Sequence, residues 1–216
     1  MGLPSGNRWA VSNLDISKPY FFQESPFQYE CSFFSWGNVT PHNPISETEF
    51  DYNFGGVNSA APYYEGQPYG DTQGSMLTGN IQLAMDAARK MLGSPWRMPE
   101  SKDFGELFNN SIYIDANGNE LDPTLNEKRV TVNDVLGIYL ESKINGARIF
   151  FPCAGYGLNQ AWGSRGNFGY YWSIDYVSSR DARRLYIRWA VAWTASGERC
   201  RGCAIRPIWN PRDLRG

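Results

Sequence analysis

Histidine is almost absent from this chain, which has one among 216 residues. Histidine is the usual general base near neutral pH and the commonest metal ligand in proteins. A single copy rules out a metal site built from several histidines and argues strongly against a Ser-His-Asp triad. The one histidine, His42, lies between Pro41 and Pro44, and this arrangement predicts an exposed turn. We therefore expect no enzyme activity and no cofactor.

Charge and long apolar runs are also scarce. Charged residues make up 19% of the chain and the net charge is −2, so nothing global suggests nucleic acid or an anionic membrane as a partner. No run of about 18 apolar residues occurs, so we expect no direct membrane insertion. Residues 1–6 have neither a basic start nor an apolar signal core. If the protein is exported, we expect its targeting segment to lie outside these residues.

Aromatic residues, by contrast, reach 15%, with 22 glycines and 13 prolines. This composition is typical of a loop-rich fold with short strands and large aromatic core residues, and it argues against a helical bundle. The length fits a single domain over residues 1–216. Between residues 17 and 79 no helical period is visible, so we expect a long loop whose aromatic side chains bury against the core, with one short strand near 31–36.

Two helices are predicted. Apolar residues lie on one face of residues 81–92, and Gly93 ends that segment. Ser101 is expected to cap a second, short helix. The expected inner face of the second helix consists of Phe104, Leu107 and Phe108.

Strands are predicted at residues 8–14, 135–140 and 147–151, the last two joined by the hairpin signal Asn145-Gly146. In residues 185–191 the apolar side chains alternate, so Leu185, Ile187, Trp189 and Val191 should face the core. Arg184, Tyr186 and Arg188 should then project from the opposite face. A turn is expected at Ser196-Gly197.

Two patterns raise the question of metal binding. Residues 115–122 resemble a calcium loop in part, but the glycine is misplaced and the final glutamate is absent, so a tight turn at Asn117-Gly118 is favoured. Cys200 and Cys203 form half of a zinc pattern, and the second half is missing. We favour ordinary structural positions for both cysteines and expect no metal site.

Seven short motifs follow one another along the chain. They are GLPSG at 2–6, FSWG at 34–37, GSPWRMP at 93–99, IFFP at 149–152, AGY at 154–156, GYYWS at 169–173 and GCAIRP at 202–207. Together they resemble Bacteroidetes paralogous surface domains of the C-type lectin-like superfamily, the branch that also contains formylglycine-generating enzymes. The resemblance implies an α+β, C-type lectin-like fold with two helices, short antiparallel strands and long loops. Residues 38–79 and 115–130 then look like insertions.

Within that superfamily the chain is most similar to variable proteins of diversity-generating retroelements. In those proteins a reverse transcriptase rewrites adenines in the C-terminal coding region, here about 174–203. The residues at the family's fixed places are Leu185, Ile187, Arg199, Gly202, Ile205, Arg206 and Pro207. The chain departs from the pattern at Cys153, Cys203 and Ala204.

The resemblance implies a non-enzymatic ligand-recognition protein with a diversified surface. Arginine, tyrosine and tryptophan, which often anchor protein interfaces, are frequent in that segment. The expected ligand-binding residues are Ile174, Asp175, Tyr176, Ser178, Arg180, Arg183, Arg184, Tyr186, Arg188, Trp193, Thr194, Ser196 and Arg201. The expected structural residues are Trp96, Trp172, Arg199, Gly202 and Arg206.

The expected partner is an unknown target, most simply a protein on another cell or host surface. The expected location is extracellular, on a cell or virion surface, and nucleic acid is not expected as a ligand. Two alternatives stay open: calcium-dependent carbohydrate binding, by fold analogy with lectins, and a formylglycine-generating type of copper and cysteine oxidase, suggested by Cys200 and Cys203. The two-residue gap between these cysteines differs from the four-residue gap usual in such enzymes.

Overall fold

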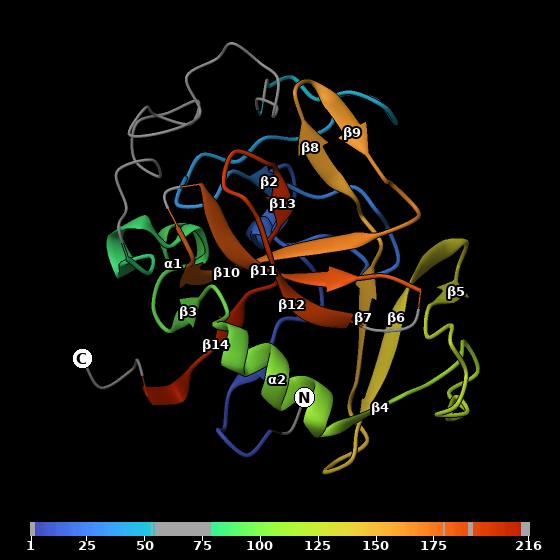
Figure 1. The fold of residues 1–216 in the computed structure, drawn as a ribbon. Coiled ribbons are helices and arrows are strands. Elements are labelled where there is room, and N and C mark those ends of the chain that lie inside the picture. The colour runs from blue at the N-terminus through green and yellow to red at the C-terminus, as the bar shows by residue number, and fades with distance from the viewer. Residues whose placement is uncertain (1–2, 53, 55–78, 179, 190–191, 213–216) are drawn as a thin grey trace.

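The computed structural model describes residues 3–52, 54, 79–178, 180–189 and 192–212. In this part of the chain few helices combine with many antiparallel strands, which is the expected α+β character (Figure 1). The α-helices are α1 (Ala87–Leu92) and α2 (Ser101–Asn109), and the short 3₁₀ turns are Pro19–Phe21 and Leu83–Met85.

The largest sheet has five strands, in the order β12 (Ala192–Glu198), β11 (Asp181–Ile187), β10 (Gly169–Tyr176), β13 (Cys203–Ala204) and β2 (Phe33–Phe34). Its strands pair antiparallel except for β10 with β13. A three-stranded sheet has the order β1 (Arg8–Trp9), β14 (Ile208–Trp209) and β3 (Trp96–Arg97).

A third sheet is built around β6 (Val135–Ser142), which pairs with β4 (Ser111–Tyr113), β5 (Val130–Val132) and β7 (Arg148–Pro152). The hairpin of β8 (Tyr156–Leu158) and β9 (Ala161–Gly163) stands beside the five-stranded sheet (Figure 1). The predicted hairpin at Asn145-Gly146 is confirmed as the β6–β7 connection, where Gly146 has a φ of 68°. Such a φ is readily adopted by glycine.

The five-stranded sheet is packed on both faces. On one face, α2 inserts Phe104 and Leu107 into a cluster with Tyr171, Leu185 and Ile187, and all five residues are completely buried. The predicted inward direction of Leu185 and Ile187 is thus confirmed. Burying one such side chain stabilises the fold by about 1.5–3 kcal/mol.

On the other face, two tryptophans tie β10 to the segment around β2. The Trp172 Nε1 donates to the Phe34 carbonyl oxygen at 2.7 Å, and the Trp36 Nε1 donates to the Ser173 carbonyl oxygen at 2.8 Å. Both indoles are completely buried, so their polar nitrogens need these acceptors. These two hydrogen bonds hold β10 against the segment around β2.

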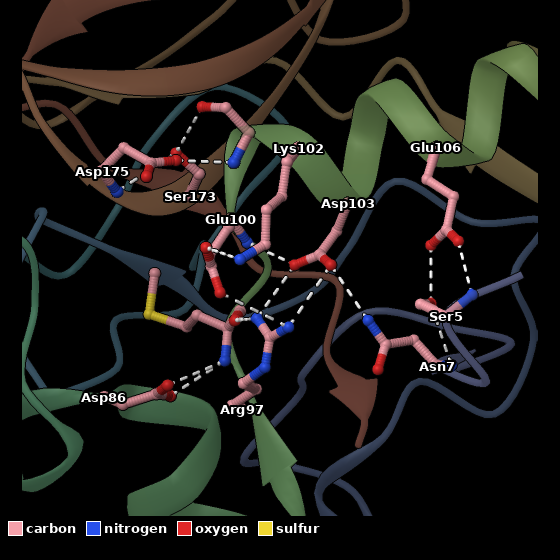
Figure 2. A network of polar contacts seen from close by, with 12 residues as sticks. Ser5, Asn7, Asp86, Arg97, Glu100, Lys102, Asp103, Glu106, Ser173 and Asp175 are labelled. Atoms are coloured by element: carbon pink, nitrogen blue, oxygen red, sulfur yellow. Dashed lines mark hydrogen bonds and ion pairs between the residues drawn. The ribbon is translucent and has the colours of Figure 1, made fainter. Parts of the chain in front are cut away.

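A polar network holds the start of α2 against the N-terminal segment (Figure 2). The buried Arg97 guanidinium pairs with Asp103 at 2.9 Å, and the Asn7 amide nitrogen donates to the same carboxylate at 3.0 Å. The Ser5 hydroxyl and backbone nitrogen both donate to Glu106, each at 2.7 Å. Breaking a buried pair such as Arg97 with Asp103 costs about 3–5 kcal/mol, so this network is part of the scaffold.

The first helix is shorter than predicted. Residues 81–92 do not form one helix, because Asp86 has extended backbone angles and its carboxylate accepts from the Arg89 backbone nitrogen at 3.0 Å, which starts α1 there. The same carboxylate accepts from the Met98 backbone nitrogen at 2.9 Å. The second helix is confirmed, but its N-cap is Glu100 and not Ser101.

Two expected turns have different outcomes. The turn at Asn117-Gly118 is confirmed, because the Asp115 carboxylate accepts from the backbone nitrogens of Asn117 and Asn119, each at 2.8 Å. The turn at Ser196-Gly197 is wrong. Both residues lie inside β12, where Ser196 pairs with Arg183 and Gly197 pairs with Ala182.

Much of the expected insertion at 38–79 lies outside the described residues, as does Val191. Some of the described aromatic residues of the long loop are buried, as expected. They include Phe33, Phe34, Phe50 and Phe54, which are almost fully buried. The strand expected at 31–36 is confirmed as β2, whereas the strand expected at 8–14 is only the two residues of β1.

Candidate functional site

Three aromatic side chains form a row across the strands β10, β11 and β12. Tyr170 is directly opposite Tyr186, which is directly opposite Trp193. Directly opposite residues have side chains on the same face of a sheet. The Tyr170 and Tyr186 rings stack with centroids 4.8 Å apart, and the Tyr186 and Trp193 rings meet edge to face at 5.2 Å. The row lies on the face away from α2.

Neighbouring segments extend this row. Tyr156 of β8 contacts Tyr170 at 5.1 Å between ring centroids. Phe168 lies 5.8 Å from both Tyr186 and Trp189. Trp189 and Trp193 are 47% and 39% exposed, which leaves large aromatic faces open to a partner.

Three guanidinium groups lie against these rings. The Arg184 Cζ is 4.5 Å from the Tyr170 centroid, the Arg188 Cζ is 4.0 Å from Trp189, and the Arg201 Cζ is 4.7 Å from Tyr156. Stacking on a ring orders the arginine while leaving its N–H groups available at the edge. We call these nine residues the aromatic–arginine surface: Tyr156, Phe168, Tyr170, Arg184, Tyr186, Arg188, Trp189, Trp193 and Arg201.

A nearly buried carboxylate fixes one end of the surface. Glu198 accepts from the Arg180 Nη2 at 2.8 Å and from the Arg201 Nε at 2.9 Å. Burial acts to raise the pKa of Glu198, but the hydrogen bonds from the two arginines outweigh it and lower the pKa below its usual value. Glu198 is therefore ionised at neutral pH and orients Arg201.

Five of the predicted ligand-binding residues belong to this surface, namely Arg184, Tyr186, Arg188, Trp193 and Arg201. A second group lies on the opposite face of the sheet. Arg183 is directly opposite Ser196, and Thr194 is directly opposite the buried Leu185. Because side chains alternate along a strand, Arg183, Thr194 and Ser196 cannot share one face with Tyr186 and Trp193. The structure therefore does not bring these three predicted residues together with Tyr186 and Trp193 on one face.

A third group is engaged in the scaffold. The Asp175 carboxylate accepts from the Ser101 backbone nitrogen at the start of α2, and the Ser178 hydroxyl accepts from the Asp181 backbone nitrogen at 3.0 Å. Tyr176 packs against Trp36, and the half-buried Ile174 packs with the same cluster. Arg180 is exposed and paired with Glu198. Arg180 is thereby linked to the aromatic–arginine surface, because Glu198 also pairs with Arg201.

The expected structural residues are mostly buried. Trp172, Arg199 and Arg206 are completely buried, and Gly202 is buried beside Phe54. The Arg206 guanidinium donates to Asn13 and to the carbonyl oxygens of Val11 and Phe150, the fixed-scaffold geometry expected for it. Trp96 is the exception, because it is only half-buried and lines a surface hollow.

Trp189 was expected in the core and is instead 47% exposed. The alternation that directs Leu185 and Ile187 inward ends with β11 at Ile187, so it no longer controls Trp189. Sequence reasoning also missed Tyr156, Phe168 and Tyr170 as members of the surface. For Tyr170 no sequence signal separated it from the core, because it is 7% exposed and lies on the same face of β10 as the buried Trp172.

The four cysteines give little support to redox or copper chemistry. All are free and buried. Burial raises the pKa of Cys153 and of Cys200 to about 12 and also raises the pKa of Cys31 and Cys203. The thiolate is the form that binds metals and reacts, so these thiols are poorly disposed for either role. Within the described residues, no group of histidine, cysteine and carboxylate side chains is arranged to hold a metal ion.

In the part of the chain that the structure describes, none of the helices has the length and apolar character needed to cross a membrane. Comparison of the chain with family models, with curated proteins and with solved structures gives no match, so a functional assignment depends on the geometry of the surface itself.

Proposed function

We propose that this protein is a non-enzymatic recognition protein that binds its ligand through the aromatic–arginine surface. The observation that carries the proposal is the row of Tyr170, Tyr186 and Trp193, flanked by arginines that lie over aromatic rings, on a sheet that packs Leu185 and Ile187 against α2 on its opposite face. The scaffold that we propose is of the C-type lectin-like type, and the role is that of a variable protein of a diversity-generating retroelement.

The two faces of β11 support a division between fold and recognition. Leu185 and Ile187 are fully buried on one face, whereas Tyr186 and Arg188 are partly exposed. Exposed substitutions usually change the free energy of unfolding by about 0.5 kcal/mol or less, whereas core truncations cost several times more. The exposed positions of the outer face, such as Trp193, can therefore vary in sequence, while the inner face and the buried Trp172 of the outer face maintain the fold.

The chemistry of the surface fits a protein partner displayed outside the cell. Tyrosine and tryptophan supply large contact areas with few rotatable bonds, and arginine forms forked hydrogen bonds to carboxylates. These residue types are enriched among the side chains that dominate binding energy at protein interfaces. We infer an extracellular setting, on a cell or virion surface, from the resemblance described above.

A selection experiment tests the binding role. A random peptide library displayed on phage would be enriched on the intact protein, and the selected peptides would then be measured against two double variants. Tyr186→Ala with Trp193→Ala should weaken binding at least tenfold. The matched control, Arg183→Ala with Ser196→Ala on the opposite face of the same strands, should leave it within about twofold. Equal loss in both variants would contradict the proposal.

The diversification role has a separate test in the genome. A near-repeat of the DNA that encodes residues 174–203, differing mainly at adenines and lying beside a reverse transcriptase gene, is the expected result. Its absence would remove the retroelement assignment and leave the binding role to the peptide experiment.

The alternative of a copper and cysteine oxidase has less support, because Cys200 and Cys203 are both buried. A titration with Cu(I) would distinguish the two functions. Stoichiometric binding that is lost in Cys200→Ser would favour the oxidase over the recognition protein.

A further inference from the structure

The outward face of the three-stranded sheet bears a second cross-strand row. Arg8 is directly opposite Trp209, which is directly opposite Trp96, so the three side chains share one face. The Arg8 guanidinium lies over the Trp209 ring, 5.1 Å from its centroid. Outward faces of small antiparallel sheets are normally polar, and two tryptophans there are unusual. On the inner face of this sheet, Trp9 and Ile208 are buried.

The row forms one wall of a hollow of about 460 Å³. Phe22 contributes a second wall and contacts Trp96 edge to face at 5.5 Å. Val11, at the rim, is 70% exposed. The full lining consists of Arg8, Trp9, Ala10, Val11, Ser12, Phe22, Gln23, Trp96 and Trp209. A volume of this size, with Phe22, Trp96 and Trp209 among its walls, falls in the range of small-molecule sites.

The polar groups of the lining restrict what can bind. The Ala10 and Val11 carbonyl oxygens accept from Arg206, and the Ser12 hydroxyl donates to the Gln23 carbonyl oxygen. The Gln23 side chain is also engaged, since its amide nitrogen donates to the Glu30 carbonyl oxygen at 2.7 Å. These particular groups are therefore already paired within the fold and offer little to a peptide backbone.

Among the described residues of the lining, Arg8 carries the only formal charge, an exposed guanidinium that lies over Trp209. Its N–H edge can pair with a carboxylate at the mouth of the hollow. The apolar walls and the single rim charge together select a ligand with a flat apolar body and one anionic group. We propose that this hollow binds small aromatic carboxylates, at a site separate from the aromatic–arginine surface.

The probe for this site is 1-naphthylacetate, with the neutral 1-naphthaleneacetamide as its isosteric partner. Calorimetric titration of the full chain should give a Kd of about 0.1–1 mM for the carboxylate. Arg8→Gln should weaken the carboxylate about three- to fivefold and leave the amide unchanged. Trp209→Ala should abolish binding of both probes, with circular dichroism used to verify that the variant folds. Trp193→Ala, on the other sheet, is the matched control and should have no effect.

Several results would overturn the site. These are the absence of binding at millimolar probe, equal weakening by Trp193→Ala, or an Arg8→Gln variant that binds both probes as the intact protein does. Tighter binding of a tetraproline peptide than of naphthylacetate would show a peptide groove instead. A dimer in sedimentation that dissociates in Trp209→Ala would show that a second copy of the chain covers the hollow.

Discussion

The guanidinium of Arg184 occupies the space that a side chain at Gly197 would need. A Cβ added to Gly197 would overlap the Cζ and Nε of Arg184. The two residues lie on adjacent strands, where Arg184 pairs with Ala195 and Gly197 pairs with Ala182. In this position the Arg184 Cζ lies over the Tyr170 ring, 4.5 Å from its centroid. Gly197 therefore leaves room for Arg184 in the aromatic–arginine surface, and it does not form a turn.

Gly197→Ala should displace Arg184 from Tyr170 without unfolding the protein. The overlap involves a flexible side chain, and Gly197 has no left-handed backbone angle to preserve. Alanine is also favoured over glycine inside a strand by about 0.5–1 kcal/mol. We expect a melting temperature within a few degrees of the original and at least a threefold loss of peptide binding. A large fall in melting temperature would contradict this account of Gly197.

Glu198 should make stability depend on pH in the acidic range. Its pKa in the folded state lies below the usual value, because the hydrogen bonds from Arg180 and Arg201 outweigh the effect of burial. The stabilisation is thus present above the pKa of the unfolded state and is lost as the pH falls through the lower folded pKa. Glu198→Gln should reduce the melting temperature at about pH 7. The difference in melting temperature between Glu198→Gln and the original protein should narrow toward about pH 3. A difference that stays constant across that range would contradict the lowered pKa assigned to Glu198.

Local patterns predicted those elements whose causes are local. The hairpin at Asn145-Gly146 and the buried face of α2 follow from turn chemistry and from a 3.6-residue period, both of which can be read from a short window. The inward direction of Leu185 and Ile187 follows from alternation. In these places the local preference and the tertiary structure agree.

Long-range contacts explain what the sequence did not reveal. Asp86 interrupts a helical pattern because its carboxylate also binds the Met98 backbone nitrogen, a partner that no period within residues 81–92 predicts. The surface brings Tyr156 from β8 against Tyr170 of β10, and this contact depends on how separate sheets pack. The register of three strands, which decides that Trp193 joins the row while Thr194 does not, is likewise a tertiary property.

The four cysteines should be unreactive in the folded protein. With a pKa of about 12, the Cys200 thiol is ionised in roughly one molecule in ten thousand at about pH 8, and burial also blocks reagent access. Ellman's reagent should detect less than one thiol per chain within minutes under native conditions and all four in guanidinium chloride. Rapid native labelling that disappears in Cys200→Ser would instead support the oxidase alternative.

The separation of fold from recognition can be tested on two neighbouring strands. Leu185 is completely buried, and its replacement by alanine should lower the free energy of unfolding by about 2–5 kcal/mol. Trp193 is 39% exposed on the other face, so Trp193→Ala should change stability by about 1 kcal/mol or less and weaken binding of the selected peptides. Urea denaturation gives both stabilities. If Trp193→Ala proves as destabilising as Leu185→Ala, the tryptophan holds the fold together, and a surface free to vary in sequence cannot include it.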